Sequence, residues 1–447
     1  MWPFSSTLSK NPMVIFKKYK KLSLFTLYVF MKQEIKLILI YLLSFLSLYS
    51  ESVISFRDIM IENTEYKNIE SVNLSYKSNI SNEIFLKTIS QEYKEIVTYH
   101  KLTKTHLNND MIGINITKKN NKPKLNVLFN CAHHSDELIS TEHCYDIIYH
   151  ILTNQNEYEK VLNHINIWIV PIVNPDGSYF FWNKSIKMGR KNGRIYEEKD
   201  ENNPYRGVDL NRNYSFKWNS GHPTASSAYR YHPFYRGEKP FSEPESMAMS
   251  ILAEQNRFLF SISFHSSASR ILYPYTIENI RNVSPDYPKL FSERLAKISK
   301  TYIAKKNIYP VDGTDQDYYY FKYGTIALLI ESSHQNPNYE MVKDITNHLR
   351  PVWQEMLNEC LYGEKIFLKV MDENGYNVEA KIEINGFKYY NNEQFTSNPL
   401  TGLYQKIVIE RKEYEIIISH PHFETKTIKI KSSNDLDPQI VTLNRKS

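Results

Sequence analysis

Cysteine is scarce in this chain, with three among 447 residues. Cys131, Cys144 and Cys360 allow at most one intramolecular bridge, so a small disulfide-rich scaffold is excluded. Stability must therefore come from buried cores, and the hydrophobic content of 41% and the length predict two domains. Cys131 follows an apolar run and is expected to be a buried residue at the end of a strand rather than a metal ligand.

The chain also lacks an excess of positive charge outside its N-terminal segment. Its formal net charge is +6, and residues 1–50 alone hold seven lysines and one glutamate, which accounts for all of that charge. The remainder is formally neutral, so the bulk charge gives no support for a nucleic-acid partner. The sequence contains neither an internal repeat nor a low-complexity tract.

No apolar run near the N-terminus is long enough for a comfortable membrane span. Residues 37–49 form a short apolar run that follows Lys36 and is flanked by small serines, which is typical of an export signal. Met31 is a plausible start, which would make residues 1–30 an extension. We therefore expect an extension and signal peptide at 1–50 and a secreted or periplasmic protein, with an uncleaved membrane anchor as the alternative.

Helix-like and strand-like segments alternate through the middle of the chain. Helical spacing of apolar residues occurs at 82–100, 140–152, 246–256 and 339–361, and strand-like runs occur at 111–117, 124–129, 165–173, 258–264 and 325–330. This alternation predicts an α/β fold with a mixed, mainly parallel sheet and helices on both faces. The corresponding domain is expected at residues 82–362, after a polar lead-in at 51–81.

Several local patterns refine this expectation. The polar residues 118–122 separate two strand-like runs and predict an antiparallel hairpin. Ser242 lies three residues before Glu245 and predicts a capped helix start. Pro351 is expected to kink or split the last helix of the domain.

After residue 362 the pattern changes to short alternating runs. They are separated by turns such as Glu373-Asn374-Gly375. This pattern predicts a small all-β sandwich of about seven strands at residues 363–447.

Two histidines and two glutamates follow strand-like runs. His134 and Glu137 come after residues 124–129, His265 follows 258–264, and Glu331 follows 325–330. The ends of such strands are where open α/β sheets bind ligands, and two histidines with one carboxylate suit a hydrolytic zinc ion. A His-x-x-Glu pair is a weak signal alone, and His133 with its own partner Asp136 offers a second register that spacing does not exclude.

An ordered series of motifs resembles the zinc carboxypeptidase family. The series comprises the His-x-x-Glu at 134–137, Asn-Pro-Asp-Gly at 174–177, Arg-Lys-Asn at 190–192, Gly-Val-Asp-Leu-Asn-Arg-Asn at 207–213, the segment 235–245, His-Ser at 265–266 and Tyr-Pro-Tyr at 273–275. This resemblance favours His134 over His133. It implies one zinc ion per chain, held by His134, Glu137 and His265.

The same resemblance implies roles for further residues. Glu331 would be the general base that takes a proton from the attacking water and returns it to the leaving amine, and Arg190 would stabilise the oxyanion. Asn211 and Arg212 would bind the free C-terminal carboxylate, because a guanidinium has a planar donor fork. Tyr309 would close over the substrate.

Substrate preference is implied by the floor of the side-chain pocket. Gln316 falls at that position, and a glutamine there resembles the branch of the family that removes C-terminal lysine or arginine. That branch also carries an acidic residue where this chain has Thr276. Asp312 or Asp315 could substitute for it, since a cationic side chain needs a nearby carboxylate.

Other features resemble the regulatory-type branch of the family. Asp136 stands where pancreatic-type members carry an arginine, and Ser267 replaces an aromatic residue of that type. The predicted β-sandwich resembles the transthyretin-like domain that follows the catalytic domain in the regulatory-type branch. Its implied role is structural support or partner contact.

The resemblance implies a zinc-dependent metallocarboxypeptidase that hydrolyses the C-terminal residue of peptides or proteins, with a possible preference for basic residues. The expected partners are peptide or protein C-termini. A peptidoglycan stem-peptide carboxypeptidase is the alternative enzyme, and a catalytically inactive binding protein is a third hypothesis. Retention of Glu331, Arg190 and the three ligand residues argues against the inactive protein.

Overall fold

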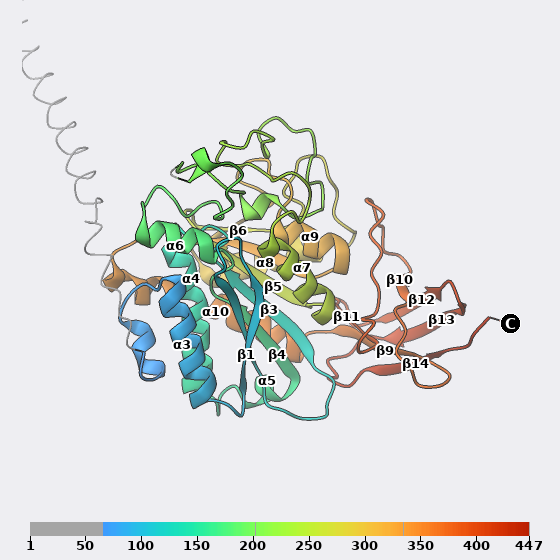
Figure 1. The fold of residues 1–447 in the computed structure, drawn as a ribbon. Helices are drawn as coiled ribbons and strands as arrows, with labels where there is room; N and C mark the ends of the chain where they lie inside the picture. Colours follow the sequence, from blue (N-terminus) through green and yellow to red (C-terminus); the bar gives the residue numbers. More distant parts are fainter. Residues whose placement is uncertain (1–65, 202, 334, 447) are drawn as a thin grey trace, which may run out of the picture. The chain divides into compact units, whose positions relative to one another are not determined.

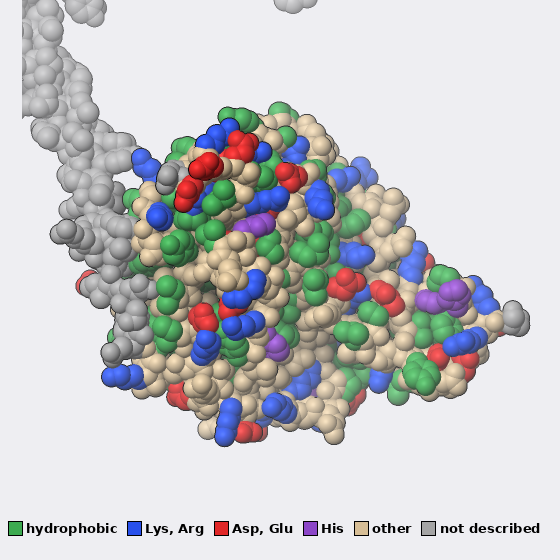
Figure 2. Space-filling model, viewed as in Figure 1, with side chains coloured by type: hydrophobic (Ala, Val, Ile, Leu, Met, Phe, Trp, Pro, Cys, Tyr) green, Lys and Arg blue, Asp and Glu red, His purple; other side chains and the backbone are tan. Residues whose placement is uncertain are grey.

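The computed structural model describes residues 66–201, 203–333 and 335–446 (Figure 1). The predicted extension and signal peptide, and the first part of the predicted lead-in, lie outside these described residues. Within the described ranges, no helix combines the length and apolar character needed to cross a membrane. On the face shown in Figure 2, basic and acidic side chains are interspersed.

An eight-stranded mixed sheet organises the α/β region, with the order β1-β2-β4-β3-β5-β8-β6-β7. The strands are β1 (Val97–Lys104), β2 (Asp110–Ile116), β3 (Leu125–Cys131), β4 (Ile165–Val170), β5 (Phe260–His265), β6 (Arg270–Leu272), β7 (Ile303–Lys305) and β8 (Ile326–Glu331). The central strands β4, β3, β5 and β8 are parallel, whereas β2 and β6 pair with them antiparallel. The predicted mixed, mainly parallel sheet is confirmed.

Helices cover both faces of this sheet (Figure 1). They are α3 (Asn79–Glu92), α4 (Leu138–Thr153), α5 (Glu159–His164), α6 (Pro175–Asn183), α7 (Pro244–Asn256), α8 (Tyr287–Ser299), α9 (Asp315–Tyr323) and α10 (Tyr339–Tyr362). Side chains on β5 show the two layers, because successive residues point to opposite faces. Phe264 stacks on His143 of α4. Its neighbour Ser263 donates to Asn130, which donates to Asp315 of α9.

The predicted hairpin of residues 111–117 and 124–129 is wrong. Strand β4 lies between β2 and β3, pairing antiparallel with the first and parallel with the second. Its isoleucines 165, 167 and 169 are all fully buried. An apolar strand of this kind is stabilised in the interior of a sheet, where it has neighbouring strands on both edges. The hairpin is formed instead by β1 and β2.

Helix boundaries also differ from the predictions. Helix α7 begins at Pro244 with Glu243 as its N-cap, because proline lacks an N–H and fits the first turn. Ser242, the predicted cap, instead donates its hydroxyl to Glu243 Oε1. Pro351 does not split α10, which is a single helix. Helix α3 ends at Glu92, so the helix predicted at 82–100 is too long.

Two three-stranded sheets follow α10. One has the order β10-β12-β13 and the other β11-β9-β14. Their strands are β9 (Lys365–Asp372), β10 (Lys381–Ile384), β11 (Leu403–Ile407), β12 (Glu413–His420), β13 (Phe423–Lys431) and β14 (Gln439–Leu443). Tyr414, Ile416 and Ile418 alternate along β12 and are buried, which gives this sheet an apolar inner face. The all-β character of this region is confirmed, with these strands in place of about seven.

A disulfide joins Cys131, at the end of β3, to Cys144 in α4. This is the one bridge that the cysteine count allows, and Cys131 is a buried strand end as predicted. Cys360 is buried and free. The bridge closes the β3–α4 loop, residues 132–137, against the helix that follows it.

Replacing both Cys131 and Cys144 by alanine should lower the free energy of unfolding by about 2–4 kcal/mol, because a cross-link over a short loop restricts the unfolded chain. Denaturant unfolding of the wild type and the double variant measures the difference. A reductant should lower the midpoint of the wild type only. Equal midpoints for the wild type and the double variant without reductant would contradict the expected contribution of the disulfide.

Candidate metal centre and active site

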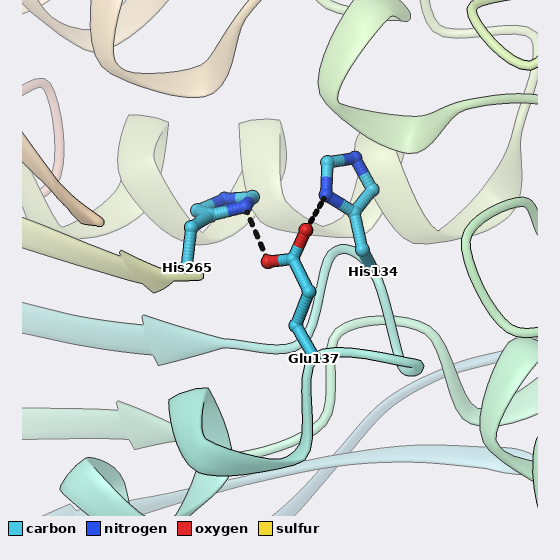
Figure 3. A group of neighbouring side chains, drawn as sticks. All are labelled: His134, Glu137 and His265. Carbon is cyan, nitrogen blue, oxygen red and sulfur yellow. Dashed lines mark hydrogen bonds and ion pairs between the residues drawn. The ribbon is translucent and has the colours of Figure 1, made fainter. Parts of the chain in front are cut away.

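Three side chains meet where β3 and β5 end. His134 lies in the β3–α4 loop, Glu137 is the N-cap residue of α4, and His265 is the last residue of β5. Because β3 and β5 are parallel neighbours, their carboxyl ends share one edge of the sheet. Figure 3 shows both imidazoles facing Glu137, with His134 Nδ1 2.8 Å from Oε1 and His265 Nδ1 3.1 Å from Oε2.

This cluster has the composition and geometry of a zinc site. One candidate ligand atom from each of the three residues lies within 4.8 Å of the others, and all three residues are buried. Two imidazole nitrogens and one carboxylate are a common protein donor set for zinc with an open fourth position. The described residues contain one group of histidine, cysteine or acidic side chains that lie this close together, and it is this one.

His133 lies outside the cluster. Its Nε2 is 2.8 Å from the Tyr214 hydroxyl, and the side chain is fully buried. The two registers that the sequence left open are therefore distinguished by contacts. The structure brings His134 and His265 to the Glu137 carboxylate, whereas the His133 ring stacks on His265 and directs its Nε2 to the tyrosine hydroxyl.

Asp209 supports His134 from the opposite side and had no role assigned from the sequence. Its Oδ1 is 3.0 Å from His134 Nε2, and its Oδ2 accepts a hydrogen bond from Arg190 at 2.7 Å. A carboxylate on the outer nitrogen of a ligating histidine fixes the ring's orientation and tautomer. The one available signal was the position of Asp209 within the motif at 207–213.

The carboxylates around His134 determine its protonation. Burial alone would lower the pKa of His134, but Glu137 and Asp209 raise it to about 9. Burial also opposes ionisation of Asp209, yet Arg190 and then Arg212 hold the pKa of Asp209 well below its usual range. His134 would have to be neutral to serve as a zinc ligand, so zinc binding would be favoured as pH rises.

Glu331 ends β8 and lies opposite His265 in the register of β5 and β8. Burial, and then the charge of Glu137, raise the pKa of Glu331. Its Oε2 has no hydrogen-bond partner in the described part of the chain. A carboxylate with a raised pKa and a free oxygen is suited to accept and return a proton.

One cavity of about 220 Å³ is lined by all of the site residues predicted from the sequence. They are His134, Glu137, Arg190, Asn211, Arg212, His265, Tyr309, Gln316 and Glu331. The remaining wall includes Leu272, Thr276 and Leu329. Loops and strand ends far apart in the sequence thus supply a single concave site that contains the three candidate metal ligands, a proton acceptor and two arginines.

Phe234 packs against the candidate substrate-binding residues, and no sequence signal pointed to it. Its ring centre is 4.9 Å from the guanidinium carbon of Arg190 and 5.1 Å from that of Arg212. The Tyr309 ring stacks on Phe234 with centroids 6.3 Å apart. Arg212 is buried and donates through Nε to the carbonyl of Ala225 at 3.0 Å, which orients its guanidinium group. Tyr309 is 44% exposed.

The suggestion that Asp312 or Asp315 replaces the missing acidic partner is not supported. Neither residue is among the described residues that line the cavity. Asp312 accepts hydrogen bonds from the backbone and hydroxyl of Ser220, and Asp315 accepts one from Asn130. Gln316 is 2% exposed, and its Oε1 has no hydrogen-bond partner among the described residues.

A family model described as zinc carboxypeptidase matches residues 83–359, which is more than half of the chain. The chain belongs to the zinc carboxypeptidase family. Zinc is the cofactor of this family, in agreement with the donor set at the strand ends. The matched residues run from α3 to α10 and contain every residue of the cavity.

Relatives and solved structures agree with this membership. Human mast cell carboxypeptidase A is 28% identical over 250 residues, which cover 51% of this chain and 56% of that protein. Rat carboxypeptidase B2 is 28% identical over 217 residues, covering 47% of this chain and 49% of that protein. The chain therefore spans about half the length of these relatives.

Two crystal structures share the fold. Carboxypeptidase A from Helicoverpa armigera has a TM-score of 0.57 at 22% identity and covers 65% of this chain and 75% of its own. Thrombin activatable fibrinolysis inhibitor has a TM-score of 0.58 at 20% identity, with 68% and 81% covered. Both comparisons support the α/β fold.

The register of the metal site can be tested by replacing each histidine in turn. His134→Gln should reduce zinc content to about a tenth of the wild-type value or less, because one of three protein ligands is lost. His133→Gln should retain zinc, since its partner is Tyr214. Elemental analysis of the dialysed, folded proteins measures both. Equal losses in the two variants would contradict the assignment.

Proposed function

We propose that this protein is a zinc-dependent metallocarboxypeptidase that hydrolyses the C-terminal residue of peptides or proteins. The observation that carries this proposal is that the three candidate zinc ligands line the same cavity as Glu331, Arg190 and Arg212. A free C-terminus carries a planar carboxylate anion, and the planar guanidinium of an arginine that lines a small cavity can bind it through two parallel hydrogen bonds.

Bound zinc would supply the Lewis acid that polarises the scissile carbonyl and lowers the pKa of the attacking water. Glu331 takes a proton from that water and returns it to the leaving amine. Arg190, which is paired with Asp209, donates hydrogen bonds to the oxyanion that forms as the carbonyl becomes tetrahedral. Arg212 and Asn211 bind the terminal carboxylate of the substrate.

Tyr309 closes over the bound substrate in this proposal. Its exposed ring at the edge of the cavity supports that role, because it can change position at little packing cost. Closing the cavity would exclude water from the charged groups and strengthen their interactions with the substrate.

The side-chain pocket would prefer residues that donate hydrogen bonds, with lysine and arginine the expected choices. The buried and unpartnered carbonyl oxygen of Gln316 supports this preference, since leaving such an acceptor unpaired costs free energy. The hydroxyl proton of Thr276 is already used in a hydrogen bond to Asp317 at 2.8 Å, so Thr276 does not donate to Gln316 in place of the substrate. A neutral acceptor favours such residues more modestly than a carboxylate would.

We also propose that the protein acts outside the cytoplasm, in a secreted or periplasmic form. The Cys131–Cys144 disulfide supports an oxidising compartment, and the apolar segment at 37–49 supports export. The two sheets after α10 would form a transthyretin-like domain, a proposal supported by their place in the chain and by their mainly antiparallel pairing, in which only β14 and β9 are parallel among the described strands.

Glu331→Gln should lower kcat by about a thousandfold or more while zinc content stays at the wild-type level, because the amide cannot accept the proton from water. Hydrolysis of peptides with free C-termini, measured beside elemental analysis, tests this. Muropeptides should be assayed beside these peptides. Faster release of an amino acid from a stem peptide than from the ordinary peptides would favour the peptidoglycan hypothesis. A wild type with no activity on either class would support the inactive binding protein.

Gln316→Leu should reduce the ratio of kcat/KM for C-terminal arginine over C-terminal leucine by about tenfold, because the variant loses the acceptor at the pocket floor. Steady-state kinetics on two peptides that differ only in the last residue give this ratio. The same peptides with amidated C-termini serve as controls and should not be cleaved. An unchanged ratio would show that Gln316 does not contact the substrate side chain.

A further inference from the structure

We propose that Glu393, in the β-rich region after α10, is a positioning residue for the substrate side-chain pocket. It acts by anchoring Tyr275, whose chain neighbour Thr276 lines the pocket. This inference rests on the proposed function and extends it, because it makes a residue outside the family-matched segment a determinant of substrate selectivity.

The anchoring contact is a buried hydrogen bond. The Tyr275 hydroxyl donates to Glu393 Oε1 at 2.9 Å, and the two residues are 0% and 4% exposed. Glu393 is held in place by its own loop. The backbone N–H of Asn391 donates to Glu393 Oε2, and the side-chain amide of Asn391 donates to Glu393 Oε1, both at 2.8 Å. A buried hydrogen bond to a charged acceptor is costly to lose, because the remaining group is left unsatisfied.

The Tyr275 ring is also fixed on its face. The Phe216 ring stacks on it with centroids 4.4 Å apart. The backbone N–H of Tyr275 donates to the Asn282 side chain at 2.8 Å. Contacts on the ring, hydroxyl and backbone therefore define the position of Tyr275, and Glu393 provides the hydroxyl contact.

The next residue, Thr276, transmits this position to two parts of the pocket. Its hydroxyl and backbone N–H both donate to Asp317, whose chain neighbour Gln316 lines the pocket. Its carbonyl accepts a hydrogen bond at 2.7 Å from Asn307, which also lines the pocket and lies two residues before Tyr309. A shift of Thr276 would therefore move both the floor residue and the loop of the closing tyrosine.

The β-rich region holds the adjoining segment at further points. Ser284 and Lys388 exchange two backbone hydrogen bonds, at 3.0 and 2.9 Å. The Asn391 side chain donates to the carbonyl of Arg281 at 2.7 Å. Residues 388–393 thus run beside 275–284, so the Glu393 contact is part of a continuous attachment behind the pocket wall.

Another contact between the same two regions provides a matched control. Arg257, at the end of α7, forms an ion pair with Glu379 at 2.7 Å. Neither residue belongs to the described lining of the cavity. Loss of this pair weakens the attachment of the β-rich region without releasing Tyr275.

The test compares Glu393→Ala, Glu393→Gln, Tyr275→Phe and Glu379→Ala in the full chain loaded with zinc. Glu393→Ala and Tyr275→Phe should each raise KM about 5- to 50-fold for peptides with the preferred C-terminal residue, with kcat changed by less than about threefold. Both should also lower the selectivity between C-terminal arginine and leucine. Glu393→Gln retains an acceptor oxygen for the Tyr275 hydroxyl but loses the acceptor for the Asn391 backbone N–H, so its KM should lie between those of the wild type and Glu393→Ala.

Glu379→Ala should leave KM and selectivity at wild-type values, even where it lowers the unfolding midpoint. The double variant Glu393→Ala/Tyr275→Phe should be no worse in KM than the more impaired single variant, because both remove the same bond. If Glu393→Ala does not fold, Tyr275→Phe and Glu393→Gln still give the comparison.

The outcomes separate this inference from the proposed function. An active wild type whose KM and selectivity are unchanged by Tyr275→Phe and Glu393→Ala would overturn the positioning role alone. Equal changes in KM for Glu393→Ala and Glu379→Ala would overturn it as well, since any loosening of the interface would then suffice. An inactive wild type would remove the proposed function, and this role with it.

Discussion

The buried carboxylate of Glu137 is the group on which the arrangement of the site depends. It faces His134 and His265 and accepts a hydrogen bond from the backbone of Ser266 at 3.0 Å. Burial opposes its ionisation, but His134 and His265 hold the pKa of Glu137 below its usual range. An unpaired buried carboxylate would be strongly destabilising, so the β3–α4 loop and the end of β5 have to remain in contact.

Motifs that carry no chemistry of their own hold that loop in place. Asn174 caps α6 through its side chain, and its amide also donates to the carbonyl of His133. The backbone carbonyl of Asn174 accepts a hydrogen bond from the Ser135 hydroxyl, and the backbone N–H of Ser135 donates to the carbonyl of Gly189. The Asn-Pro-Asp-Gly turn is therefore a scaffold for the metal-binding loop as well as the start of a helix.

The sequence predicted the fold best where one property dominates. Long apolar runs located β4, β5 and β8, because strands buried on both faces contain few polar residues. Strand neighbours were harder to predict, since pairing is decided by contacts far apart in the sequence. The polar stretch 118–122 was compatible with a hairpin or with a connection across β4, and local pattern does not distinguish them.

The candidate site shows the same division. The motif series located His134, Glu137, Arg190, Asn211, Arg212 and His265, because each sits in a short segment of characteristic composition, whereas Tyr309, Gln316 and Glu331 were placed by their positions in the family resemblance. The roles of Asp209 and Phe234 depend on contacts between loops, which leave no periodic or spacing signal in the chain. The attachment of Tyr275 to Glu393 is likewise invisible in the sequence, since 118 positions separate the two residues.

The pairing of His265 with Glu331 has a consequence for how robust the site is to mutation. The two residues end adjacent parallel strands in direct register, so their spacing is set by the interstrand repeat of the backbone, about 4.8 Å. Nearly every amino acid can make those backbone bonds, so substitutions within β5 or β8 can alter packing while preserving the interval. Insertion or deletion of one residue in β8 is different, because it would turn Glu331 to the opposite face. The geometry of the candidate site is thus insensitive to many changes of side chain in these strands and sensitive to changes of their length.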